Sequence, residues 1–180
     1  MEWVDVAFMT QVQFWNILEK VHQKSGTDIE KRFAVMEAEL GKLSLKEVRS
    51  FETHFNRCVH RAYTWDLWGA AYVIGGGCSD DGFWDFRSTL ITCGRKVFER
   101  ALKHPDSLAD LPFELGDSLQ VEGLQYISGN VAKRLGGDVP GPSTPHPKRP
   151  KGKNWDEGDL PNLYPRLTKM YDIDPRKRCE

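Results

Sequence analysis

Apolar residues recur at steps of three and four positions through most of the region before residue 136, which is the repeat of one face of an α-helix. This pattern predicts a first helix that ends near Gly26, and a second that is capped by Asp28 and stops at Gly41. A third helix is predicted to begin at the capping-box sequence SLKE, 44–47, and to lead into WDLWGAAYVI, 65–74. The N-terminal part of the chain is thus predicted to be a series of amphipathic helices.

Glycine and proline interrupt this helical pattern at only a few places. The triple glycine at 75–77 predicts a break, after which Ser79 is the expected N-cap of a helix whose apolar face continues as far as Pro105. A further helix is expected from about Asp117 to Arg134. No segment alternates between apolar and polar residues as a strand would. The predicted fold class is therefore all-α, a single compact helical domain of about five to seven helices.

The composition changes in the last quarter of the sequence, which predicts a division of the chain into three parts. Residues 1–135 form the predicted helical domain, and GGDVPGPSTPHPKRPKGK, 136–153, is expected to be an extended Pro/Gly-rich linker or wrapping arm. Residues 154–180 regain apolar side chains and are predicted to dock back on the helices. The expected anchors are Trp155, Leu160, Leu163, Tyr164, Leu167 and Tyr171.

The overall charge argues against a polyanionic partner. The 180 residues carry a formal net charge of -1, so no global field draws the molecule to nucleic acid or anionic lipid. The basic stretch HPKRPKGK, 146–153, is a local candidate for polyanion binding, but the acidic sequence NWDEGD follows it directly. Because short charge runs usually only interact with solvent, nucleic-acid binding is not predicted.

Cysteine usage and the absence of targeting signals favour a cytoplasmic location. The four cysteines match no Cys-x-x-Cys or zinc-ribbon spacing, and isolated thiols of this kind are expected to stay reduced. Glu2 and Asp5 stand where a signal peptide would have basic residues. No apolar run approaches the ~18 residues of a membrane span, so no membrane contact is predicted. The cysteines are Cys58, Cys78, Cys93 and Cys179.

The segment GGGCSDDGFWDFR, 75–87, concentrates unlike chemistry and allows two interpretations. In the structural one, Ser79 caps a helix and two aspartates in its first turn stabilise the positive end of the dipole by about 0.3–1 kcal/mol each. In the functional one, Asp80, Asp81 and Asp85 act as catalytic acids or bases. The structural interpretation is favoured, although capping requires Ser79 alone.

Aromatic and charged residues of the same region form a candidate binding corner. Asp81, Asp85, Ser88 and Arg95 are predicted to share one face of a helix, and Arg87 is a natural partner for the carboxylates. Apolar walls with a few convergent charges are typical of small-ligand sites, but a buried charge network that fixes a helix crossing explains the residues equally well. The candidate ligand-binding residues are Asp66, Trp68, Ser79, Asp81, Trp84, Arg87 and Arg95.

Metal-binding patterns are weak. His54 and His60 are six residues apart and point to different faces of their helix, so only one of them could join Cys78, Asp80 and Asp81. No structural metal site or cofactor is therefore predicted, and a weak magnesium or calcium site at Asp80 and Asp81 is the alternative. The remaining histidines are expected at surface or linker positions: His22, His104 and His146.

Several motifs resemble a known family. They are FWNILE at 14–19, the long block YTWDLWGAAYVIGGGCSDDGFWDFRSTLITCGRKVFERAL at 63–102 with the PDSLADL that follows it, and GKNWDEGDLPNLYPRL at 152–167. In these segments the chain is similar to the bacterial domain-of-unknown-function family 4240. The resemblance implies a mainly helical bacterial domain and supplies no catalytic residues.

Two functions remain as hypotheses. The first is a non-enzymatic module that binds a small molecule or a protein partner around the Trp/Asp/Arg corner, within residues 65–95. The alternative is an enzyme that uses Asp80, Asp81 or Asp85 for acid–base or metal-assisted chemistry, with Arg87 or Arg95 holding an anionic substrate. The first predicts binding that largely survives chelation and carboxylate-to-amide changes, and the second predicts a metal- or pH-dependent activity that those changes abolish.

Overall fold

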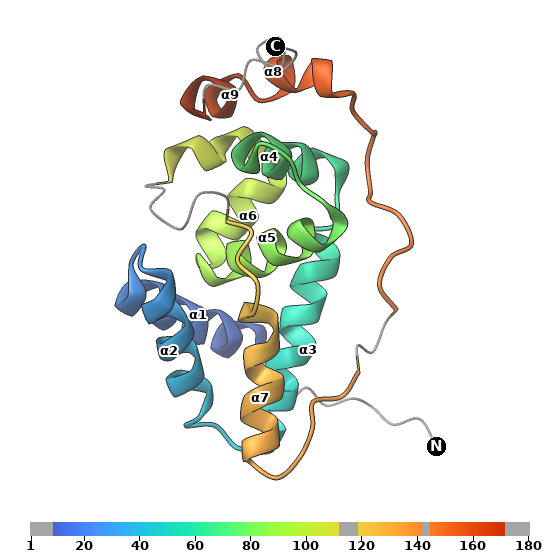
Figure 1. Ribbon diagram of the computed structural model, residues 1–180. Helices are drawn as coiled ribbons and strands as arrows, with labels where there is room; N and C mark the ends of the chain where they lie inside the picture. Colours follow the sequence, from blue (N-terminus) through green and yellow to red (C-terminus); the bar gives the residue numbers. More distant parts are fainter. Residues whose placement is uncertain (1–8, 112–118, 142–144, 172–180) are drawn as a thin grey trace.

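The protein is built from helices (Figure 1), as a computed structural model of the chain shows. The structure describes residues 9–111, 119–141 and 145–171. These residues form nine α-helices and three short 3₁₀ segments, and they include no β-strand. Thr64 and Lys151 form an isolated β-bridge. The predicted all-α class is confirmed, whereas the predicted five to seven helices are too few.

The first three helices follow the sequence pattern closely. They are α1 (Gln11–Ser25), α2 (Ile29–Leu40) and α3 (Leu45–Arg61). Gly26 ends α1 with a φ of 56°, and the Asp28 side chain accepts a hydrogen bond from the Lys31 amide at the start of α2. Both bonds of the capping box between Ser44 and Glu47 are present. All three caps are local, because their partners lie within a few residues of each other.

The predicted continuation of α3 into the tryptophan-rich segment is wrong. The chain leaves α3 at Ala62 and starts α4 (Trp65–Gly75) only after Thr64, whose side chain accepts a hydrogen bond from the Leu67 amide. In the gap, the Trp65 amide donates to the Lys151 carbonyl at 2.8 Å and the Lys151 amide donates to the Tyr63 carbonyl at 3.0 Å. The break is therefore stabilised by a segment far along the chain, which the local pattern does not reveal.

A second unpredicted break divides the helix that follows the triple glycine. Ser79 caps α5 (Asp80–Thr92) as expected, but α6 (Arg95–Lys103) is a separate helix. Gly94 between them has a φ of 92°, and a β-carbon there would lie 2.7 Å from a carboxylate oxygen of Glu19. That carboxylate accepts a hydrogen bond from the Arg95 amide, so the backbone turns where a side chain would not fit.

The helix expected from Asp117 to Arg134 is shorter than predicted. Residues 112–118 lie outside the described part of the chain, α7 comprises Ile127–Arg134, and a single 3₁₀ turn, η2 (Leu124–Tyr126), precedes it. Gly123 has a φ of 114°, and a β-carbon there would lie 2.9 Å from the Phe33 ring. The left-handed backbone at this glycine stops the helix from extending toward its N-terminus.

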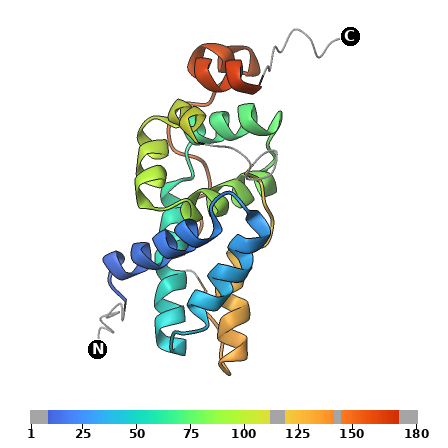
Figure 2. The same ribbon diagram turned by 90° about the vertical axis from the view of Figure 1, so that its left-hand side faces the viewer.

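Helix α5 lies in the middle of the molecule, between two groups of helices (Figure 1). Below it in that view, α1 contacts α2 and α3, and α7 packs on both α2 and α3 (Figure 2). Above it are α4, α6 and η1 (Pro105–Asp110). The centre is filled by fully buried aromatic rings: Phe14, Phe51, Phe83, Phe86 and Phe98.

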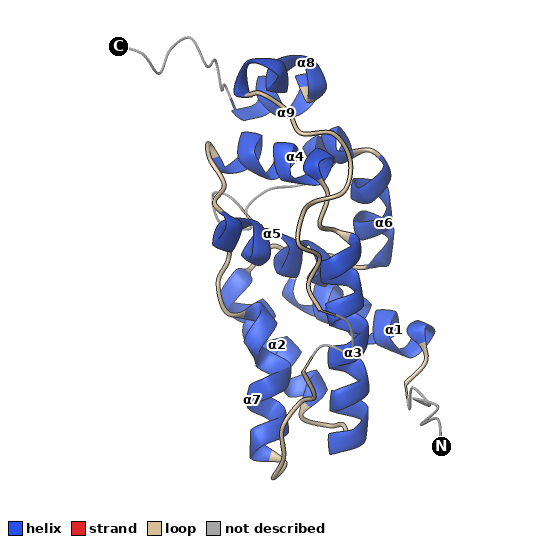
Figure 3. Cartoon of the chain, turned by 90° about the vertical axis from the view of Figure 1, so that its right-hand side faces the viewer, coloured by secondary structure: helices blue, strands red, loops and turns tan. Residues whose placement is uncertain are grey.

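After α7 the described residues pass along one side of the helices, and the last of them, up to Tyr171, lie on top of the helices (Figure 3). The last described elements are η3 (Glu157–Asp159), α8 (Leu160–Leu163) and α9 (Pro165–Tyr171), which cover α4 and η1. The Tyr164 hydroxyl donates to the Asp66 carbonyl at 2.7 Å, and its ring occupies the space above Gly69. Leu163 is 52% exposed, so its predicted role as an anchor is wrong.

The described cysteines are free thiols, of which Cys58 and Cys93 are buried and Cys78 is half-buried. Cys179 lies outside the described residues. None of the described helices has the length and apolar character needed to cross a membrane.

Candidate functional site

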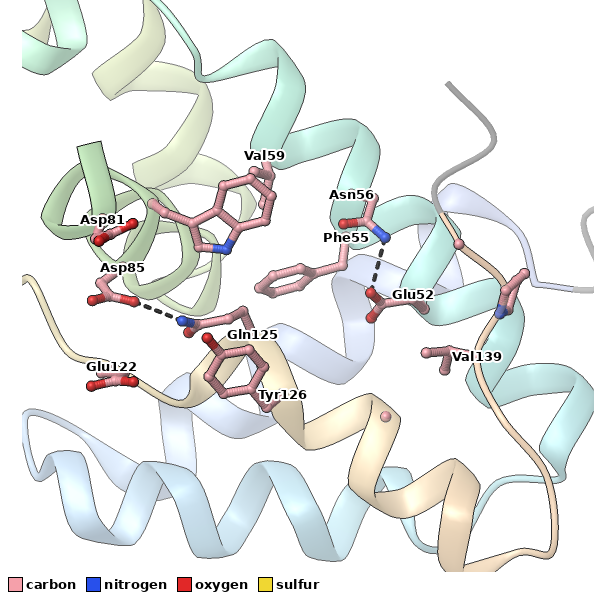
Figure 4. Close-up of a pocket in the computed structure, with 14 residues that line it drawn as sticks. Glu52, Phe55, Asn56, Val59, Asp81, Asp85, Glu122, Gln125, Tyr126 and Val139 are labelled. Carbon is pink, nitrogen blue, oxygen red and sulfur yellow. Dashed lines mark hydrogen bonds between the residues drawn. The ribbon is translucent and has the colours of Figure 1, made fainter. Parts of the chain in front are cut away.

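A groove of about 720 Å³ lies between α3, α5, residues 122–129 and residues 139–141 (Figure 4). Helix α3 forms its back wall through Glu52, Phe55, Asn56 and Val59. These four residues follow the i, i+3, i+4, i+7 spacing of one helix face, so two turns of α3 point into the groove. The groove thus runs along α3 for about 10 Å, at 1.5 Å per residue.

Helix α5 lines the groove through Asp81, Trp84 and Asp85, and its two aspartates lie at one end. Ser79 aligns this helix by accepting a 3.1 Å hydrogen bond from the Gly82 amide. Asp85 accepts a 2.7 Å hydrogen bond from the Gln125 side-chain amide, which orients its carboxylate. Burial raises the pKa of Asp85. The hydrogen bond from Gln125 acts in the opposite direction, but the effect of burial is larger. Two carboxylates on successive turns of α5 therefore face the same space.

A further carboxylate, Glu52, lies at the opposite end of the groove (Figure 4). It accepts a 2.9 Å hydrogen bond from the Asn56 side chain and another from the Ser128 hydroxyl. Burial raises the pKa of Glu52, and both hydrogen bonds act in the other direction by favouring the charged form. Glu52 is thus a largely buried acid that is held in one orientation.

Aromatic rings occupy the middle of the groove. Phe55 lies between the two ends, and Tyr126 faces it from the 122–129 segment (Figure 4). Trp84 is the third aromatic residue of the lining. The Tyr126 side chain is 57% exposed, which is unusual for so large a ring. These rings offer π faces and apolar surface between groups of acids.

All the charged side chains of the groove are acidic. Four carboxylates line it, on Glu52, Asp81, Asp85 and Glu122, and its described lining includes no lysine, arginine or histidine. Carboxylates and aromatic faces both attract cations, whereas an anion would be repelled by the carboxylates. The arrangement is suited to bind a positively charged group.

The predicted pairing of Arg87 with the aspartates is wrong. Arg87 is 1% exposed and takes part in none of the ion pairs found among the described residues. Its guanidinium donates to the carbonyls of Val59 and Phe83 at 2.9 and 3.1 Å. It also lies 5.2 Å from the centre of the Trp84 ring, and burial lowers the pKa of Arg87 to about 10. Arg87 remains a cation at neutral pH and supports the groove from behind.

Arg95 does not lie on the helix that carries the groove aspartates. It is the first residue of α6, beyond the break at Gly94, and it is exposed. Ser88 is fully buried and its hydroxyl donates to the Trp84 carbonyl at 3.0 Å. The predicted common face of Asp81, Asp85, Ser88 and Arg95 therefore reduces to the two aspartates.

Two other predicted ligand-binding residues have structural contacts in place of groove positions. Trp68 stacks between Trp65 and Phe83, at ring-centre distances of 5.3 and 4.8 Å, and its indole donates to the Cys78 carbonyl at 3.0 Å. Asp66 is exposed in the first turn of α4, where its carbonyl accepts from Tyr164. Neither side chain lines the groove.

The histidines lie in different environments, and His104 is exposed as predicted. His54 is buried and its ring contacts the Met9 carbonyl at 2.8 Å. His146, expected at a surface or linker position, is half-buried, with its ring centre 4.5 Å from that of Tyr63 and its Nε2 3.2 Å from the Arg87 guanidinium. Within the described ranges, no three histidine, cysteine or acidic side chains are close enough together to share a metal ion. Asp80 is exposed and does not line the groove.

Most of the groove lies outside the region 65–95 that the sequence pattern singled out, since only Asp81, Trp84 and Asp85 of its lining residues belong to that region. Glu52, Glu122, Gln125 and Tyr126 come from α3 and from the segment before α7. The one signal in the sequence is that Glu52 and Asn56 border the apolar stripe of α3 four residues apart, which places both on one helix face. The partners of that face depend on how the helices pack.

Comparison with known proteins supplies the family. The family described as "Protein of unknown function (DUF4240)" matches residues 9–134, which is more than half of the chain. The chain belongs to this family. No curated protein and no solved structure was found to match it.

The DUF4240 match includes all of the groove except one edge. Helices α3 and α5 and the 122–129 segment lie within the matched residues, whereas 139–141 and His146 follow them. The acids and aromatic rings of the groove therefore belong to the DUF4240 part of the chain, and residues 139–141, which follow it in the sequence, form the remaining edge.

Proposed function

We propose that the protein is a binding module whose ligand is positively charged and occupies the groove between α3, α5 and residues 122–129. The observation that carries this proposal is the lining: four carboxylates and three aromatic rings, with no basic side chain among its described residues. A cation over an aromatic face gains roughly 0.5–2 kcal/mol, depending on how far it is desolvated. Partly buried carboxylates add an attraction that is stronger than in bulk water.

The charge of the groove also argues against an anionic substrate. That alternative depended on Arg87 or Arg95 to hold the anion. Arg87 is buried behind Trp84, and Arg95 lies on α6 outside the groove. An anion in the groove would meet carboxylates on both α3 and α5. The proposed ligand is therefore an organic ammonium or a similar cation, from a small molecule or from a protein partner.

Acid–base catalysis is the second candidate function, and the position of Asp85 favours it. Asp85 faces the groove, burial raises its pKa, and Asp81 lies one helical turn away. A general acid works best when its pKa is close to the working pH. Titration of the labelled Asp85 carboxyl by NMR separates the two functions: a pKa near 7 supports catalysis, and a pKa in the ordinary aspartate range supports the binding module.

The proposed setting is a bacterial cytoplasm. Cys58, Cys78 and Cys93 are free thiols, as in proteins of reducing compartments. We also propose that residues 136–153 act as an extended arm between the helical domain of 1–135 and the C-terminal segment 154–180. The hydrogen bonds of Lys151 with Tyr63 and Trp65 support a role for this arm in holding the C-terminal segment on α4.

The test is an NMR titration with two ligands of the same shape and opposite charge, butylammonium and butyrate, at low ionic strength. Butylammonium is expected to shift the signals of the Trp84 indole and the Gln125 amide, and butyrate is not. Asp85→Asn should weaken the binding, while Glu30→Gln, an equal charge change at an exposed position of α2, should not. Equal shifts with both ligands, or none with either, would contradict the proposal.

A further inference from the structure

The four carboxylates of the groove are divided between its two ends. Asp81, Asp85 and Glu122 lie together on one side of the aromatic rings, and Glu52 lies on the other (Figure 4). A single compact cation can contact only one of these ends at a time. The second end then has no role in binding it.

The separation of the ends follows from helix α3. Val59 is beside the Asp85 end, because its carbonyl is bound by Arg87 from the helix that carries Asp85. Glu52 is seven residues earlier on α3, which corresponds to about 10 Å along the helix axis. The two acidic ends are therefore about two helical turns apart.

The surface between the ends is apolar and aromatic. Phe55 and Tyr126 lie there (Figure 4), Trp84 is the third aromatic residue of the lining, and the described lining residues include no other charged side chain than those at the two ends. Methylene groups pack favourably on such a surface, as the stems of lysine side chains do on apolar protein surface. An ammonium group over this middle surface would be too far from either end to form an ion pair with a carboxylate.

Both ends are oriented before any ligand arrives. Gln125 holds Asp85 through a 2.7 Å hydrogen bond, and Asn56 holds Glu52 through one of 2.9 Å, with Ser128 as its second donor. Each carboxylate oxygen has two lone pairs, so these bonds leave room for a further donor. Carboxylates that are already in place lose little conformational entropy on binding.

We propose that the groove binds an elongated aliphatic dication of the diamine or polyamine class, with one ammonium at Asp81 and Asp85, the other at Glu52, and the methylene chain on Phe55, Trp84 and Tyr126. This inference rests on the proposed function, and it adds that the ligand carries two ammonium groups whose separation matches that of the two acidic ends. The second ammonium is what distinguishes the ligand from other cations, and Glu52 is the residue that selects for it.

The test compares α,ω-diaminoalkanes of increasing length with monoamines of the same length, by calorimetric titration at pH 8 and low ionic strength. Each added ion pair is expected to contribute a gain in affinity of up to about fivefold. Diamines long enough to reach both ends should therefore bind about two- to fivefold tighter than their matched monoamines, while the shortest should show no preference.

Variants at the two ends identify the contacts. Glu52→Gln should remove the preference for the long diamine, because it weakens the long diamine more than the matched monoamine, whereas Asp85→Asn should weaken both ligands. Glu30→Gln is the matched control for general electrostatic attraction. Circular dichroism of each variant verifies that it is folded.

The outcomes separate this inference from the proposed function. If monoamines and diamines of all lengths bind equally well, or if Glu52→Gln keeps the diamine preference, the two-ended site is wrong while the cation-binding groove stands. If no amine binds in the groove, both proposals are wrong. A length optimum that disappears in Glu52→Gln alone supports the two-ended site.

Discussion

The guanidinium of Arg87 on α5 donates a 2.9 Å hydrogen bond to the carbonyl of Val59 in the last turn of α3. The final carbonyls of a helix have no partner within it, and they carry the negative end of its dipole. Arg87 supplies both a donor and a positive charge at this point. Three aromatic rings surround the cation at 4.7 to 5.2 Å, and they belong to Tyr63, Phe83 and Trp84. This contact fixes α5 against α3, and the groove forms between those two helices.

Arg87→Met is expected to lower the free energy of unfolding by about 2–4 kcal/mol, because the variant leaves the buried Val59 carbonyl without its donor and removes a charge-assisted hydrogen bond. Urea unfolding measures the change. Arg95→Met, at an exposed position of α6, is the control and should change stability by no more than about 0.5 kcal/mol. Equal stability of the two variants would mean that Arg87 does not hold the helix crossing.

Gly69→Ala should loosen the C-terminal segment from α4. A β-carbon at this position would lie 2.5 Å from the Tyr164 hydroxyl and 2.7 Å from its ring, so Tyr164 must move. The expected destabilisation is about 1–3 kcal/mol, as for other overpacked sites. Limited proteolysis followed by mass spectrometry should detect faster cleavage in residues 145–160.

Gly158→Ala is the matched control, since no atom lies within 4 Å of a β-carbon there. It should be cleaved at the wild-type rate. A Gly69→Ala protein with wild-type stability and protection would contradict the close packing of Tyr164 on α4.

Acidification should destabilise the protein through His146. Burial lowers the pKa of His146, and the adjacent Arg87 lowers it further. The unfolded histidine therefore takes up its proton at a higher pH than the folded one, so stability falls as the pH drops through about 6.5. Burial and His146 also lower the pKa of His60, which acts in the same direction.

The measurement is the melting temperature between pH 8 and pH 5. His146→Asn should flatten the profile in part, and His104→Asn, at an exposed position, should leave it unchanged. An unaltered slope in His146→Asn would show that its contact with Arg87 does not disfavour protonation.

Glu52→Gln should be at least as stable as the wild type at pH 8. Burial raises the folded-state pKa of Glu52, so its charged form opposes folding; this cost develops as the pH rises from the unfolded pKa through the folded-state pKa, and it stays constant at higher pH. A neutral glutamine avoids the cost and keeps a carbonyl that can accept from Asn56. The stability difference should disappear as the pH falls and the carboxyl becomes protonated.

Thermal unfolding between pH 4 and pH 8 measures this difference, with Glu122→Gln on the exposed rim as control. A large loss of stability in Glu52→Gln at pH 8 would show that the carboxylate serves the fold. A gain in stability together with a loss of diamine preference would indicate that the chain retains a costly acid for binding.

Part of the site was predictable from the sequence. The sequence predicts that Asp81 and Asp85 lie on the same face of a capped helix, because residues four positions apart are one helical turn apart. The sequence does not reveal that Arg87 is buried behind them, because the i+4 periodicity does not say which neighbouring element covers a helix face. Its predicted pairing with the aspartates failed for this reason.

The sequence by itself determined the helical class and the starts of α2, α3 and α5, since Asp28, Ser44 and Ser79 each bond to an amide three residues away. Tertiary structure alone decided where the long apolar stripes break. Thr64 stands beside Lys151 and Gly94 beside Glu19, contacts between residues far apart in the chain.

The groove depends on tertiary structure for the same reason. Its acids come from α3, from α5 and from the segment before α7, and each looks in the sequence like an ordinary polar residue next to an apolar stripe. Local hydrogen bonding and periodicity act over one helical turn, and they determine which helices form. The packing of those helices brings Glu52 and Asp85 to opposite ends of a single groove.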